Sequence, residues 1–403
     1  MTIQNNVTVD VVSTPETTLG TPAISSSASA KLIRRVQSNI ALNKDIFQSQ
    51  EVRPDQQIVD ERHGTKRSAG SIDSELSCQS YDDWMEALLR GTWAVGPTAS
   101  NTDFTSITAD GILPQFTFAG GDPVAKGFRI GHIIRLTGAL GGNELDQFRI
   151  TGFSGTTNRV VSVDHVPVAV TPAITTFTVA APGKLLTNGT QRRSFSIEQR
   201  YNDVAFSELF LGMRVASGQF KIPPNGMATA SWAFQGTNMQ VKKAGAFPYF
   251  TAATPASTTS VLAGPSGQLR FAGAERAIVT GLDFSIDNQI TADPVIGSTV
   301  LPEVFYGVMK IGGTMSLFLQ DSTLIEAFLA EQIADLVAVV TSGTGSGSDF
   351  LSFNMQRVKV NGATKSVAAA GGVVLSCPFS ALLATASAGI DGSTLTIQRS
   401  NLT

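Results

Sequence analysis

One short pattern of apolar and polar positions occurs twice in the chain. The stretches WMEALL and LIEAFL begin 240 positions apart (324 − 84), and each holds a Glu-Ala pair between two apolar pairs. In the first stretch Trp84 and Leu88 are spaced i and i+4, and in the second Leu324 and Phe328 have the same spacing. This spacing puts both side chains on one face of a helix. We therefore expect two equivalent helices that bury these residues in their cores.

Strand-like alternation of apolar and polar residues repeats around the two helices. Gly64 and Gly70 align with Gly307 and Gly313 at a single offset of 243 (307 − 64 and 313 − 70). The order of the matches predicts that strand, strand, helix and strand follow one another in both copies. Two further segments match: residues 39–43 with 283–287 at an offset of 244 (283 − 39), and residues 214–234 with 359–379 at an offset of 145 (359 − 214).

The offset between the copies changes along the chain. Its fall from 240 to 145 means that the first copy holds about 95 residues (240 − 145) that the second lacks, between Leu89 and Arg214. Gly, Asn and Pro separate short β-branched runs in this interval, which is typical of strands joined by turns. We expect a small inserted all-β module with strands near residues 132–138, 148–152, 159–163 and 176–180.

These boundaries predict the domain organisation. Residues 1–30 are rich in Ser, Thr and Ala and lack the pattern of a secretory signal, so we expect a flexible N-terminal arm. The remaining predicted parts are a discontinuous first domain (31–91 and 191–245), the inserted β domain (92–190) and a second domain (246–403).

Composition narrows the classes of function. The formal charge of −3 and the pI near 5.7 do not match the basic surface of a protein that grips nucleic acid. Cys78 and Cys377 lack metal-ligand spacing, so we expect two buried thiols. The most apolar region, 324–340, contains three acidic residues and predicts an amphipathic helix in place of a membrane span.

The sequence offers no convincing set of catalytic, cofactor-binding or metal-binding residues. His63, His132 and His165 are far apart, and the neighbouring Asp164 and His165 are more typical of an exposed strand end than of a catalytic dyad. No GxSxG motif occurs. We therefore expect a protein that is not an enzyme and that needs no cofactor or metal.

The first copy resembles a known family. Residues 35–89, which begin RVQSNIALNKDIFQSQ and end with DDWMEALL, resemble the tail tube proteins of long-tailed bacteriophages. The second copy, with LDFSIDNQITADPVIGS and VFYGVMKIGGTMSLFL, resembles the same family more faintly. The resemblance implies a mainly β fold with flanking helices (α+β). It implies two β-sandwich domains of the tail-tube type, whose sheets join those of neighbouring subunits into a ring with a continuous inner β-barrel.

The resemblance also implies contacts between stacked rings. Residues 48–60 and 291–302 are polar or Pro-containing and too long for tight turns, so they are candidate stacking hairpins, although an ordinary surface loop would have the same composition. The candidate contact residues are Gln50, Glu51, Arg53, Asp55, Gln57, Asp293, Val295 and Ile296.

The duplication affects the expected ring symmetry and partners. Six domains would close a ring of three chains, with the inserted module projecting at three positions. The implied partners are further copies of the chain, the tape measure protein and transiently phage DNA in the lumen, and the tail terminator and tail tip proteins, with no membrane. The implied location is the virion tail, after assembly in the host cytoplasm. A capsid-associated or decoration protein and a carbohydrate-binding tail module are the alternatives.

Overall fold

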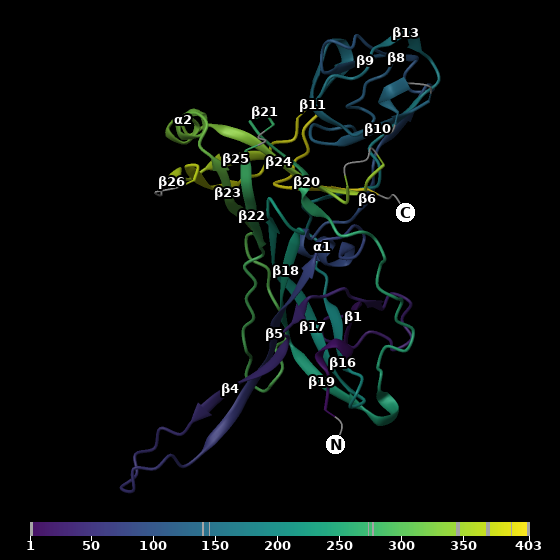
Figure 1. The fold of residues 1–403 in the computed structure, drawn as a ribbon. Coiled ribbons are helices and arrows are strands. Elements are labelled where there is room, and N and C mark those ends of the chain that lie inside the picture. Colours follow the sequence, from purple (N-terminus) through teal and green to yellow (C-terminus); the bar gives the residue numbers. More distant parts are fainter. Residues whose placement is uncertain are drawn as a thin grey trace.

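The computed structural model consists mainly of antiparallel β-strands (Figure 1). It describes residues 3–138, 141–144, 146–272, 274–275, 278–343, 347–367, 371–387 and 389–400. In this part of the chain, a 20-stranded sheet and a separate 8-stranded sheet are accompanied by two α-helices, α1 (Asp82–Leu89) and α2 (Thr323–Leu329). The predicted mainly β fold with flanking helices is confirmed, and within one chain the described strands do not close into a barrel.

The large sheet contains strands from both copies of the sequence pattern. Its earlier strands are β1 (Val9–Pro15), β2 (Lys31–Leu32), β3 (Gln37–Ser38), β4 (Ala41–Gln48), β5 (Glu61–Glu75), β6 (Ala94–Val95), β15 (Lys184–Thr187), β16 (Phe195–Tyr201), β17 (Phe206–Ile222), β18 (Thr229–Gly236) and β19 (Asn238–Lys243). Its later strands are β20 (Ala263–Phe271), β21 (Ala274–Glu275), β22 (Val279–Asp287), β23 (Lys310–Phe318), β24 (Ile333–Thr341), β25 (Phe350–Val360), β26 (Thr364–Ser366), β27 (Val374–Ala381) and β28 (Thr396–Arg399).

Two groups of four strands follow one another in this sheet. The first unit has the order β4-β5-β18-β17 and carries α1. The second unit has the order β22-β23-β27-β25 and carries α2. A ladder between β17 and β22 joins the two units into one continuous central sheet.

The two units pair their strands in the same register. When the sequence offsets of 243, 244 and 145 are applied to the residue pairs of the first unit, they give residue pairs that the second unit makes. Because a slip of one residue would turn every side chain to the opposite face, this agreement ties the repeated sequence pattern to repeated structure. The matching pairs are Asn43–Arg67 with Asp287–Lys310, Gly70–Phe234 with Gly313–Phe379, and Val215–Phe234 with Val360–Phe379.

Gly70 and Gly313 show why the repeat contains glycine. A Cβ atom at Gly70 would lie 2.5 Å from the Cα of Ile40, and one at Gly313 would lie 2.6 Å from the Cα of Phe284. Ile40 and Phe284 are themselves equivalent at the offset of 244 (284 − 40). In both units, glycine therefore lets the neighbouring strand approach at the same point.

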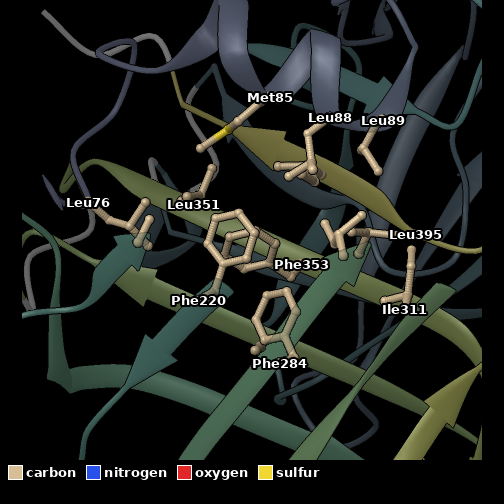
Figure 2. Packing of buried hydrophobic residues seen from close by; sticks show 14 of the residues in the cluster. Leu76, Met85, Leu88, Leu89, Phe220, Phe284, Ile311, Leu351, Phe353 and Leu395 are labelled. Atoms are coloured by element: carbon tan, nitrogen blue, oxygen red, sulfur yellow. The ribbon is translucent and has the colours of Figure 1, made fainter. Parts of the chain in front are cut away.

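A single hydrophobic core joins the two units. The first half of β17 pairs with β16 and β19. In the second unit, β25 pairs with β24 along nearly its whole length and with β28 over residues 351–354. Where the units meet, the rings of Phe220, Phe284 and Phe353 have centroids 5.0 to 5.2 Å apart. Met85 and Leu88 of α1 lie over this aromatic group (Figure 2).

The two helices differ in how much of their surface is covered. Trp84 and Leu88 of α1 are fully buried, as is Leu324 of α2, whereas Phe328 is only partly buried. Leu329 is 73% exposed although its counterpart Leu89 is buried. The helical pattern therefore occurs in both units, but only α1 is enclosed on the side of its last turn.

The inserted sequence forms the 8-stranded sheet, which has its own aromatic core. The predicted insert of residues 92–190 is too long, because β6 and β15 lie in the large sheet, where β15 pairs with both β6 and β28. The strands of the small sheet are β7 (Thr98–Ser100), β8 (Ser106–Ala109), β9 (Gln115–Ala119), β10 (Ile133–Thr137), β11 (Phe148–Ser154), β12 (Val160–Val163), β13 (Val170–Ile174) and β14 (Thr178–Ala180).

The insert packs on the second unit, although its sequence interrupts the first. The side-chain amide of Gln398 accepts a hydrogen bond from the Ile133 N–H (2.8 Å) and donates one to the Ile133 carbonyl (2.9 Å). Ile133 also lies in an apolar cluster with Val337, Val339 and Phe350. The insert is thus held by both polar and apolar contacts to strands of the second copy.

The N-terminal arm is partly a strand of the large sheet. β1 pairs with β16 along its whole length, and Val11 and Val12 are buried. The hydroxyl of Ser13 accepts a hydrogen bond from the indole N–H of Trp84 (3.1 Å). The prediction of a flexible arm over residues 1–30 is therefore wrong for residues 9–15, because a short β-branched run lies within the Ser- and Thr-rich composition.

Candidate assembly surfaces

One face of the central sheet is polar and is lined by small side chains. In β5, β18, β17, β22, β23 and β27, residues alternate between the hydrophobic core and this opposite face, as strand geometry requires. We call this surface the polar face. It is formed by Ser71, Asp73, Gln219, Lys221, Thr229, Ser231, Ala233, Asp283, Ser285, Asp287, Lys310, Gly312, Thr314, Ser316, Ser376 and Ser380.

The lysines of the polar face have acidic neighbours across the strands. Lys221 of β17 lies directly opposite Asp283 of β22, and Lys310 of β23 lies directly opposite Asp287. Opposite charges at such positions attract one another and reduce the field that either projects into solvent. Asp73 adds negative charge, and its carboxylate accepts a hydrogen bond from Ser231 (2.5 Å). The face is therefore polar without a concentration of positive charge.

The first candidate stacking hairpin projects from the body of the molecule (Figure 1). It connects β4 with β5, and residues 50–62 are exposed. Arg53 and Asp55 form an ion pair (3.0 Å), and the hydrogen bond from Arg53 lowers the pKa of Asp55. Val52 is 99% exposed and Ile58 is 66% exposed. Gln50, Glu51, Arg53, Asp55 and Gln57 thus lie together on a projecting tip that also carries apolar side chains.

The second candidate hairpin has a different structure. The connection between β22 and β23 runs beside β5, where the Lys66 N–H donates to the Thr299 carbonyl (2.8 Å), and its buried residues Ala292, Leu301 and Val304 form a small apolar cluster. Asp293, Val295 and Ile296 are exposed at its tip. The two sets of candidate contact residues therefore lie on separate tips. The first tip projects into solvent, whereas the second belongs to a connection that packs beside β5.

Arg214 fixes the base of the second connection. Its guanidinium forms an ion pair with Glu303 (2.5 Å) and donates a hydrogen bond to the Val304 carbonyl. It also lies over the ring of Tyr306, 5.2 Å from the centroid. Because these contacts join the connection to β17, the second connection is held against the first unit of the chain.

The three histidines have separate surroundings. His63 lies on the projecting hairpin, and His132 lies near Asp391, with an Nε2–Oδ2 distance of 3.7 Å. His165 lies in the insert between Asp164 (3.0 Å) and Asp146 (3.1 Å), and the hydrogen bond to Asp164 is the main cause that raises its pKa to about 9. The ring also stacks on Phe148, with centroids 4.5 Å apart. These ion pairs and the stacking contact join neighbouring segments of the insert.

The described residues contain neither a metal-binding cluster nor a helix that could span a membrane. Across the described ranges, no three His, Cys, Asp or Glu side chains gather closely enough to hold a metal ion. Neither α1 nor α2, the α-helices of the described residues, has the length and apolarity needed to cross a membrane.

The polar face was not located by sequence reasoning. Its signal is the two-residue alternation that runs through β18 and β27 and through parts of β22 and β23, where the outward positions are mostly Ser, Thr, Gly and Asp. This signal identifies two-faced strands, but it does not reveal that strands from both copies form one surface. The β17–β22 ladder supplies that information.

Comparison with known proteins places the chain in a family. No curated protein matches it. The family model described as phage tail tube protein matches residues 6–381, which includes both units and the insert. The match agrees with the resemblance noted in residues 35–89 and, more faintly, in the second copy. The chain belongs to the phage tail tube protein family and is a structural component of a phage tail.

Proposed function

We propose that three copies of this tail tube protein close into a ring, and that rings stack into a hollow conduit for delivery of the genome into the host. One observation carries the proposal: the central sheet contains two four-strand units with the same internal register, and the β17–β22 ladder joins them. A closed assembly repeats one contact around an axis, so three chains with two units each supply six similar wall segments.

The polar face is proposed to line the lumen. Lysine and arginine contacts to phosphate create affinity, which would retard a sliding polyanion. Lys221 and Lys310 each face an aspartate across the strands, and most of the other side chains are small and uncharged. A wall of this composition offers DNA few places to bind. The opposite face of the sheet is filled by the hydrophobic core and cannot line a channel.

The projecting tips are proposed to join successive rings. Val52 and Ile58 on the first tip and Ile296 on the second are exposed within otherwise polar segments. Burial of apolar surface stabilises association, at about 25 cal/mol per Å². We expect these side chains to be covered when the hairpin of one ring meets the adjacent ring.

The further proposed partners follow from a tube of this kind. The tape measure protein would occupy the lumen before DNA enters, and the tail terminator and tail tip proteins would cover the two open ends. Assembly would take place in the host cytoplasm before the tail becomes part of the virion.

Electron microscopy of purified and concentrated protein tests the proposal. We expect hollow tubes with a regular axial repeat, and labelling of intact virions along the tail. A capsid decoration protein would instead remain untubulated and would label the head. That result would overturn the proposed function.

A further inference from the structure

The ladder that joins the two units within one chain provides a template for a contact between chains. In this ladder β17 and β22 are antiparallel, and six consecutive residues of each strand are paired, from Ser217 opposite Asp287 to Ile222 opposite Leu282. Each unit thus has one edge that corresponds to β17 and another that corresponds to β22. Within the chain, the β17 edge of the first unit pairs with the β22 edge of the second unit. The corresponding β22-type edge of the first unit and β17-type edge of the second unit are not used by this ladder.

The unused edges can be located from the repeat. Adding 145 to residues 217–222 gives residues 362–367, which include β26, and subtracting 244 from residues 282–287 gives residues 38–43, which span the end of β3 and the start of β4. The register of β26 with β27 supports the first assignment, because Thr364 lies opposite Ser376 just as Gln219 lies opposite Ser231.

Both edges lack a second ladder partner within the described part of the chain. β26 pairs with β27, and β3 and β4 pair with β5, in each case along one side. Thr364 and Lys365 are exposed, and so are Ala41 and Asn43. An unpaired strand edge presents N–H and C=O groups that another strand can bind.

We infer that residues 362–367 of one chain pair with residues 38–43 of the next chain, antiparallel and in the register of the β17–β22 ladder. This inference rests on the proposed ring, and it names the two segments that close it. The partners across the contact are Gly362–Asn43, Ala363–Leu42, Thr364–Ala41, Lys365–Ile40, Ser366–Asn39 and Val367–Ser38.

The side chains fit the two faces of such a sheet. On the core side, Ala363 and Leu42 take the places of Gly218 and Ile286, again a small residue opposite a large aliphatic one. On the polar side, Ser366 and Asn39 stand at the positions of Lys221 and Asp283, so the polar face continues across the contact without added charge.

The contact between chains is less apolar than the joint within the chain. Lys365 and Ile40 replace the stacked pair Phe220 and Phe284, whose ring centroids are 5.0 Å apart. A lysine stem can cover apolar surface while its ammonium group stays in water. A single chain can therefore expose Lys365 to solvent before assembly, whereas an exposed phenylalanine would favour aggregation.

The contact connects two different edges, so it is heterologous and can repeat around a ring. A chain that carries both edges accepts one neighbour on each side. Three such contacts leave no unpaired edge of this kind in a closed ring of three.

Cysteine cross-linking tests the register. In the variant Ala41→Cys with Thr364→Cys, the new thiols lie directly opposite each other between chains, and oxidation should give covalent dimers and trimers. Burial raises the pKa of Cys78 to about 12 and of Cys377 to about 11, so the native thiols stay unreactive. The within-chain counterpart Gln219→Cys with Ser285→Cys should cross-link without forming dimers.

A variant with a one-residue slip is the matched control. Leu42→Cys with Thr364→Cys puts the two thiols on opposite faces of the sheet, and its yield of covalent trimer should be at least tenfold lower. Equal yields from the slipped and unslipped pairs, or tubes that form without any cross-link, would overturn the inferred register and leave the tube function intact. Absence of rings and tubes from the wild-type chain would instead overturn the proposed function.

Hydrogen exchange on the wild-type chain gives a second test that needs no substitution. Amides in residues 38–43 and 362–367 should gain protection on assembly, whereas those in residues 217–222 and 282–287 should be protected already. Unchanged exchange of both edges in assembled tubes would overturn the contact.

Discussion

The two units share a strand order and a register, yet their helices are held differently. α1 forms three ion pairs with segments distant in the sequence: Asp83 with Lys31 (2.7 Å), Asp82 with Arg399 (2.6 Å) and Glu86 with Arg193 (3.3 Å). In α2, the acidic Glu326 bonds to the hydroxyl of the adjacent Ser322 (2.5 Å). The apolar pattern is similar in the two helices, but segments from distant parts of the chain enclose only the first.

This difference shows how a duplicated chain can lose equivalence while keeping its central sheet. The N-terminal arm reaches α1 through Ser13, β2 reaches it through Lys31, and β28 reaches it through Arg399. The second unit instead carries the insert, which packs against β24, β25 and β28. The central ladders are conserved between the units, whereas the outer attachments are not. We expect an assembly to be nearly sixfold at its inner wall and threefold at its outer surface.

The connections between the first two strands of each unit should differ most in assembly. Replacement of residues 50–57 by a short Gly-Ser turn removes an exposed tip, so the chain should fold with unchanged stability and fail to form tubes. Replacement of residues 293–296 should reduce tube growth less, because the rest of that connection is held by Arg214 and its apolar cluster. Electron microscopy and thermal unfolding measure the two effects.

A control for loop replacement is available in the insert. The exposed turn at residues 155–157 can be replaced in the same way, and tube formation should be retained. Unfolding of the chain after replacement of residues 50–57 would mean that the hairpin belongs to the core of the first unit.

Truncation of equivalent helix residues should destabilise the first unit more than the second. Trp84→Ala removes an indole that contacts Trp232 and Phe234 and bonds to Ser13, and it should cost about 3 to 5 kcal/mol. Leu324→Ala removes a smaller buried side chain and should cost about 2 kcal/mol. Leu329→Ala at the exposed end of α2 should be nearly neutral. Denaturant titration measures all three, and equal losses for Trp84 and Leu324 would contradict the unequal enclosure of the helices.

The attachment of the insert to the second unit should depend on Gln398. Gln398→Ala leaves the N–H and C=O of Ile133 without their side-chain partner, which should cost about 1 to 3 kcal/mol. Limited proteolysis should become faster in the two segments that connect the insert to the large sheet, near residues 92–97 and 181–190. Gln356→Ala, which removes one bond to the Ile130 carbonyl that Asn354 also binds, should have a smaller effect. If both variants resist protease like the wild type, the insert is held by its apolar contacts alone.

The smallest expected effect is a pH dependence confined to the insert. Because the folded-state pKa of His165 is raised from 6.5 to about 9, its charged form stabilises the insert fully below pH 6.5, and this stabilisation is lost as the pH rises through about 9. The side chain is 44% exposed, so solvent weakens the effect. The unfolding temperature of His165→Gln should vary less between pH 6 and pH 10 than the unfolding temperature of the wild type. Identical pH profiles of the variant and the wild type would show that the ion pairs of His165 do not contribute to stability.

Sequence reasoning could locate the repeat because the spacing of residues within each segment can be read from the sequence alone. Gly70 and Gly313 keep their spacing to the strands around them, and offsets read from the sequence match the ladders of the structure. Trp84, Leu88 and Leu324 are buried where helical spacing places them.

Long-range packing explains what sequence reasoning could not provide. The exposure of Leu329 depends on which distant segments reach α2, and the position of the insert depends on contacts between Ile133 and residues more than 200 positions later. Likewise, the valines of β1 lie within a Ser- and Thr-rich segment, and they form a strand because they pair with the edge that β16 offers. None of these outcomes is encoded in a local pattern.

A cryo-EM reconstruction of the assembled tube tests the central claim most directly. We predict three chains in each ring, an inner wall of six similar units, and three outer protrusions formed by the insert. The density should show one continuous sheet, in which residues 362–367 of one chain lie beside residues 38–43 of the next and run antiparallel to them. A ring of six chains, or six equal protrusions, would contradict the account.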